Sequence, residues 1–111
     1  MTPINIESLL DNYDGDHAVA TEMLYCFRDM VPGFINELRE YARESDRIAT
    51  LKMVRKIHNI SACAHVVSVQ DKISELEFAA KAGDMDSVRN IVPQLEEKCN
   101  EALSAINSHG K

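Results

Sequence analysis

The chain has 111 residues, of which 45% are hydrophobic and 27% are charged, values typical of one globular domain with a core of moderate size. A formal net charge of −6 and the lack of a basic cluster argue against nucleic acids and anionic membranes as partners. No apolar run of roughly 18 residues and no signal-peptide pattern are found, so we expect a cytoplasmic protein.

Hydrophobic periodicity predicts two helices in the first part of the chain. The first covers Ile4–Tyr13, and the turn after it offers Asp16 as an N-cap for the next helix. The second covers His17–Arg43, where apolar residues recur at intervals of three and four. Pro32 lies inside this segment, so we expect a kink there or a division into two helices.

Three further helices are predicted after a turn at residues 44–46. They cover Arg47–Val67, Val69–Ala82 and Asp86–Ile106, and each carries an apolar side. Gly83 is placed as a C-cap for the middle one of the three.

These elements define a fold class. No segment alternates as a strand does, and short connections between long amphipathic helices favour antiparallel neighbours. We therefore expect an all-α protein, an antiparallel four-helix bundle with a short N-terminal helix. It would form one domain over residues 1–111, and we expect a monomer because a complete bundle needs no partner to close its core.

Patterns of enzymes and metal sites are missing from the sequence. It has no glycine-rich phosphate loop, no His-Glu-x-x-His pattern and no Gly-x-Ser-x-Gly pattern. The three cysteines, Cys26, Cys63 and Cys99, are far apart and fit free, buried thiols. Cys63 and His65 are two residues apart and would point to different sides of a helix, so we expect no metal site. No cofactor and no independent active site are expected.

The third predicted helix would place His58 and His65 on almost the same face, because seven residues are nearly two turns. Neutral imidazole can attack a phosphoryl group at physiological pH, since its unperturbed pKa is about 6.5. Ser61 and Ala62 are small enough to let a partner approach, and the Arg55 guanidinium can offer two donors to a phosphate. A solvated surface histidine without function is the alternative, and the residues alone leave both interpretations open.

The chain resembles the histidine-containing phosphotransfer (HPt) domains of bacterial phosphorelays over nearly its whole length. The resemblance lies in LLDNYDGD, in MLYCFRDMVPGFINELREY, in the histidine-bearing helix and in LEFAAKAGD. The family pattern Ala-His-x-Leu-Lys-Gly, with small residues after it, matches Ile57 to Ala64. The resemblance implies that His58 is the phospho-acceptor, that Ile60 takes the leucine position and that Cys63 and Ala64 are the small residues. Ser61 stands in place of the family's lysine and Ala62 in place of its glycine.

A second register is open. Counting without gaps, forward from Asp46 or backward from Leu76 and Glu77, puts Arg55 at the histidine position and His58 at the lysine position. The local run and the helical phase favour His58.

The resemblance implies a phosphorelay carrier whose partners are response-regulator receiver domains and hybrid histidine kinases. On the third helix we expect a docking surface that uses Arg55, Asn59 and Ser61 for orientation, with His65 as a neighbour and Leu51, Ala62 and Val66 as apolar contacts. Two alternatives remain at this point. One is a pseudo-HPt domain that docks receivers without being phosphorylated, and the other is a helical adaptor unconnected with phosphorelays.

Overall fold

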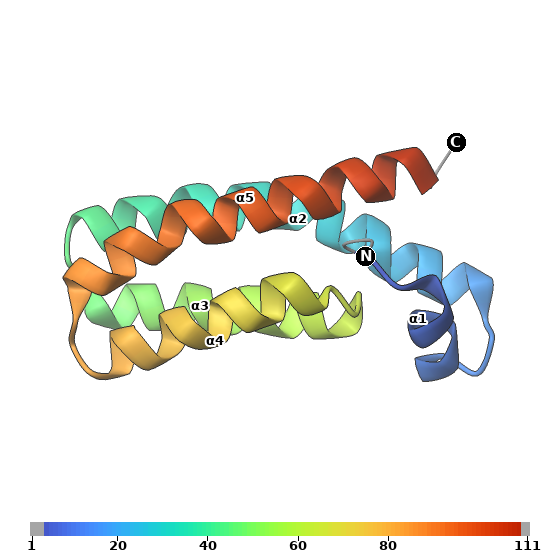
Figure 1. Cartoon of the computed structure of the whole chain (residues 1–111), viewed down its shortest axis with the longest axis horizontal. Coiled ribbons are helices and arrows are strands. Elements are labelled where there is room, and N and C mark those ends of the chain that lie inside the picture. The colour runs from blue at the N-terminus through green and yellow to red at the C-terminus, as the bar shows by residue number, and fades with distance from the viewer. Residues whose placement is uncertain (1–3, 110–111) are drawn as a thin grey trace.

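The structure is a computed structural model and describes residues 4–109. It contains α1 (Ile6–Asn12), α2 (His17–Arg43), α3 (Arg47–Cys63), α4 (Val67–Lys81) and α5 (Met85–His109), and the described residues form no strand. Helices α2 to α5 form an antiparallel bundle in which α2 packs on α3 and α5, and α4 packs on α3 and α5. Figure 1 shows α1 at the end of the bundle where α3 turns into α4. The predicted fold class is confirmed.

The core of the bundle is one cluster of buried apolar side chains from all five helices and the segments between them. Its largest fully buried members include Leu9, Phe27, Leu38, Ile57, Leu76 and Leu95. Burying a side chain of this size stabilises the fold by roughly 1.5–3 kcal/mol. Because these positions recur every three or four residues, helices are the structure that buries them together.

Pro32 does not divide α2. The helix runs without interruption from His17 to Arg43, and Figure 1 shows one continuous ribbon whose N-terminal part is inclined to the rest. Proline has no backbone N–H, so the hydrogen bond to the carbonyl of Arg28 is lost while the helix continues past it. The N-terminal part of α2 reaches beyond the α3–α4 turn and contacts α1.

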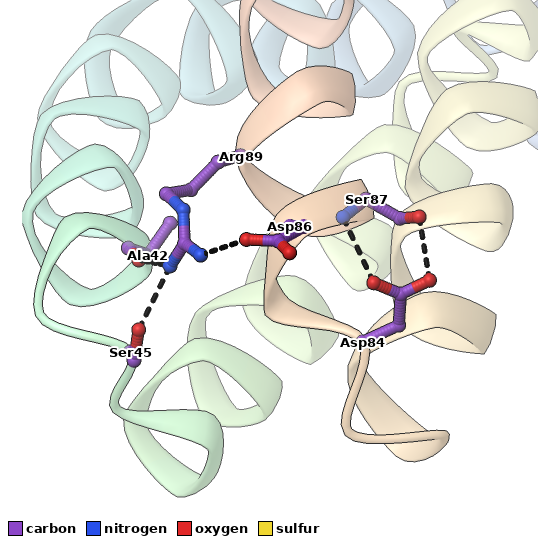
Figure 2. Close-up of polar contacts among 6 residues, drawn as sticks. All are labelled: Ala42, Ser45, Asp84, Asp86, Ser87 and Arg89. Carbon is purple, nitrogen blue, oxygen red and sulfur yellow. Dashed lines mark hydrogen bonds and ion pairs between the residues drawn. The ribbon is translucent and has the colours of Figure 1, made fainter.

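Acidic side chains fix the starts of three long helices. Asp16 accepts a hydrogen bond from the backbone N–H of Val19, as the sequence predicts. Asp46 accepts the equivalent bond at the start of α3. Asp84 does so before α5, where it accepts both the N–H and the hydroxyl of Ser87 (Figure 2). Each carboxylate satisfies a donor that the first helical turn leaves unpaired.

The third helix is shorter than predicted, because it ends at Cys63 rather than at Val67. His65 has a left-handed backbone with φ of 55°, and the N–H of Val66 bonds to the carbonyl of Ser61 at 2.9 Å. This 6→1 bond closes a helix of the Schellman type, and Val66 is fully buried behind it. Glycine usually occupies the left-handed position, which is why a histidine there gave no stop signal in the sequence.

Three helix C-termini accept hydrogen bonds from a side chain that is remote in sequence. At the end of α2, Arg89 from α5 donates to the carbonyl of Ala42 at 3.1 Å and to the Ser45 hydroxyl at 2.8 Å, and it pairs with Asp86 (Figure 2).

Arg47 of α3 donates in the same way to the carbonyls of Ala80 and Lys81 at the end of α4, both at 2.8 Å. Tyr13, the C-cap residue of α1, donates its hydroxyl to the carbonyl of Cys63 at 2.8 Å. Since the last carbonyls of a helix have no partner within it, these contacts tie the helices into one bundle.

Candidate functional site

The exposed side of α3 is the candidate site, because it carries most of the residues that the sequence singles out. The core side of the helix is formed by Thr50, Met53, Val54, Ile57 and Ser61. Arg55, His58 and Asn59 are exposed, as predicted, and Ala62 and Leu51 are half-buried beside them. By the 3.6-residue repeat, Arg55 lies nearly opposite the core side, whereas His58 lies toward α4.

Charge is distributed unevenly between α3 and the rest of the chain. Helix α3 carries four of the 12 Lys and Arg residues and none of the 18 Asp and Glu residues. The remaining residues therefore carry eight basic and 18 acidic side chains. An acidic protein thus presents one helix whose charged side chains are all cationic: Arg47, Lys52, Arg55 and Lys56. Counting charges helix by helix, rather than over the whole chain, would have found this in the sequence.

These four cations differ in what they contact. Arg47 is bound to the end of α4, and Lys56 lies over the ring of Phe34, with its Nζ 5.8 Å from the ring centre. Lys52 and Arg55 form no hydrogen bond, ion pair or ring contact with the residues that the structure describes. The two are three positions apart and therefore adjacent on the helix surface.

His58 is exposed and makes no hydrogen bond within the described part of the chain. Both ring nitrogens are therefore accessible to a partner. Arg55 precedes it by three residues and Ala62 follows it by four, so both are its neighbours on the helix. The geometry provides an accessible imidazole next to a guanidinium, on a rigid helix.

Two residues expected on this surface lie inside the protein. Ser61 is fully buried, and its hydroxyl donates to the carbonyl of Ile57 at 2.6 Å, one turn earlier. Its side chain is therefore a core group and cannot orient a docked partner. Val66 is also fully buried, in the turn between α3 and α4. Ala62 remains the small, half-buried residue of the exposed side.

His65 is not on the same helical face as His58, because α3 ends before it. It is half-buried, and its Nδ1 lies 3.2 Å from the side-chain nitrogen of Asn12 in α1. Nearby, burial and the Cys63 side chain raise the pKa of the Tyr13 phenol, which keeps its proton for the bond to the Cys63 carbonyl. His65 therefore belongs to the contact between α1 and the end of α3.

A groove of about 310 Å³ runs beside the exposed side of α3, between it and α2. Its walls include Tyr41 from α2 and Ile48, Lys52 and Lys56 from α3. Ile48 is 66% exposed, which is unusual for a large apolar side chain and adds apolar area next to the cations. Positive charge and exposed apolar area thus lie side by side along this groove.

Other classes of site gain no support from the described residues. Within residues 4–109, no three His, Cys, Asp or Glu side chains gather closely enough to hold a metal ion. Of the three cysteines, Cys63 is exposed, Cys26 is half-buried and Cys99 is buried, where burial and then Glu96 raise the pKa of the thiol to about 12. No helix in this part of the chain is both long and apolar enough to span a membrane.

Comparison with solved structures identifies the fold. The chain is similar to the HPT domain of the Hpt sensor hybrid histidine kinase from Shewanella, a crystal structure at 1.80 Å, with a TM-score of 0.86 and 20% sequence identity. The match covers 96% of this chain and 92% of that domain. No protein-family model matches the sequence, and no curated protein matches it. The chain therefore has the fold of an HPt domain.

Proposed function

We propose that this chain is a phosphorelay domain that docks receiver domains of response regulators and hybrid kinases on the exposed side of α3. The observation that carries this proposal is the concentration of cations without any carboxylate on that helix, in a chain of net charge −6. A receiver that bears a phosphoaspartate presents negative charge, and complementary charge both steers association and fixes orientation. The bundle supplies a rigid platform, and the receiver supplies its own Mg²⁺.

In one version of this proposal the chain itself is phosphorylated, and His58 is then the acceptor. Its Nε2 attacks the phosphorus of the aspartyl phosphate, so that an N–P bond forms while the P–O bond to the aspartate breaks. The aspartate leaves as a carboxylate, and the charge that develops on the ring is lost when the Nδ1 proton passes to solvent. His58 is exposed and free of hydrogen bonds within the described residues, which this attack requires.

A second candidate, docking without phosphorylation, is favoured by the burial of two residues. The HPt pattern places a core leucine two residues after its histidine and a lysine beside the phosphate three residues after it. Counted from His58, these positions are the half-buried Ile60 and the fully buried Ser61. Counted from Arg55, they are the fully buried Ile57 and the exposed His58. The second register fits the burial pattern better, and in it the acceptor position holds an arginine, which cannot take up a phosphoryl group.

Phosphate transfer separates these candidates. The receivers of the source genome, radiolabelled by their own kinases, would be mixed with the wild-type chain, with His58→Gln and with the control His17→Gln, whose exposed histidine begins α2. Acid-labile label on the wild type and control, absent from His58→Gln, supports His58 as acceptor. Binding of a receiver without any label supports docking alone. Failure of every receiver to bind contradicts the proposed function in both forms.

A further inference from the structure

Arg55 differs from every other arginine in the chain. All six arginines lie in the described residues, and five of them have a polar partner. These five are Arg28 with Asp29, Arg39 with Glu96, Arg43 with Glu40, Arg47 with the end of α4, and Arg89 with Asp86 and the end of α2. Within this part of the chain Arg55 has none, although its protein is rich in carboxylates.

Lys52 is the neighbour of Arg55 and is also without a partner among the described residues. Asn59 follows Arg55 by four residues and adds an exposed amide on the same side. The carboxylates that line the adjoining groove are Glu37 of α2 and Asp46, and the Asp46 side chain caps α3. Neither forms an ion pair with Lys52 or Arg55, so the positive charge of the pair is available to a ligand.

The chemistry of the pair favours a phosphoryl group over a carboxylate. A guanidinium offers two parallel N–H donors that match two oxygens of a phosphoryl group, and an ammonium adds a compact charge. Two cations side by side complement a dianion better than a single negative charge. His58 lies beside Arg55 on the α4 side and is not itself one of the two cations.

We propose that Arg55 and Lys52 bind the phosphoryl group of a phosphorylated receiver, so that this chain recognises the phosphorylated form in preference to the unphosphorylated one. The identity of the partner rests on the proposed function, but the recognition chemistry does not depend on transfer to His58. A domain with this site distinguishes the two states of a receiver by affinity, with or without removing the phosphate.

The test uses a stable analogue of the acyl phosphate. Acetonylphosphonate has a methylene group in place of the bridging oxygen of acetyl phosphate, so it can bind but cannot transfer phosphate. Titrated into the ¹⁵N-labelled chain, it should shift the amide signals of residues 52–59 and the Arg55 Nε–H signal. The variant Arg55→Gln should weaken the apparent affinity about tenfold, and Lys52→Gln should weaken it about threefold.

Arg43→Gln is the matched control, because its side chain is 72% exposed and lies on α2, away from the site. It should leave the titration unchanged. Absence of shifts at residues 52–59, shifts that survive Arg55→Gln, or equal shifts with acetate would each overturn the inference. Because this titration contains no receiver, it can fail while receivers still dock, and it can succeed even where none transfers phosphate.

Discussion

Two arginines of α3 have opposite surroundings. Arg47, at the start of the helix, directs its donors to backbone carbonyls at the end of α4, whereas Arg55, two turns later, has no partner among the described residues. Arg89 of α5 repeats the arrangement of Arg47, because it donates to a backbone carbonyl at the end of α2 (Figure 2). The comparison teaches that arginine stabilises this fold where it completes a helix end, and that an arginine without any partner among the described residues marks a surface available for binding.

The largest expected effect tests this comparison directly. Arg47→Ala and Arg89→Ala each leave helix-end carbonyls without a charged donor, and we expect each to lower the free energy of unfolding by about 2 kcal/mol. Arg55→Ala, on the same helix as Arg47, should change it by less than about 0.5 kcal/mol. Urea unfolding followed by circular dichroism measures all three. Equal losses for Arg47→Ala and Arg55→Ala would show that the comparison is wrong.

A smaller effect is expected at the end of the bundle where Tyr13 contacts the end of α3. Tyr13→Phe removes the hydrogen bond to the carbonyl of Cys63 and should lower the free energy of unfolding by about 1 kcal/mol. Tyr41→Phe is the control, because no hydrogen bond from the Tyr41 hydroxyl is found in residues 4–109. The same urea unfolding experiment applies, and a Tyr13→Phe protein as stable as its control would mean that α1 does not help to hold the end of α3.

The smallest expected effect is a dependence of stability on pH that arises at the start of α5. The hydroxyl and N–H of Ser87 hold the pKa of Asp84 below its usual 3.8. The ionised form therefore stabilises the fold above about pH 4, and this contribution is lost as the pH falls through the lower pKa of the folded state. Between about pH 5 and about pH 2, the wild type should lose slightly more stability than Asp84→Asn, measured by urea unfolding at each pH. A greater loss in the variant would contradict the assigned cause.

Much of the fold could be predicted from the sequence, because its signals are local. The apolar period identifies five helices, and Asp16 and Gly83 occupy the cap positions expected of them. The end of α3 could not be found in this way. His65 takes a left-handed conformation that gives no local signal, and its turn is stabilised by Val66, which is buried by the assembled bundle.

The candidate site was predicted in part. Arg55, His58 and Asn59 lie on the exposed side as predicted, but the predicted docking surface also included Ser61, which is buried. A serine can be buried in a helix when its hydroxyl bonds to the preceding turn, so its polarity alone does not show its side. Lys52 was missed because the net charge of the chain is negative, and the net charge does not show how charged residues are divided among the helices.

The side chains that complete the helix ends also bear on how the chain folds. Each comes from a residue remote in sequence: 47 positions separate Arg89 from Ala42, 50 separate Tyr13 from Cys63, and 33 separate Arg47 from Ala80. A partly assembled bundle would therefore leave helix ends exposed and unpaired. We expect cooperative, two-state folding, with amides on both sides of these contacts exchanging hydrogen through the same global opening.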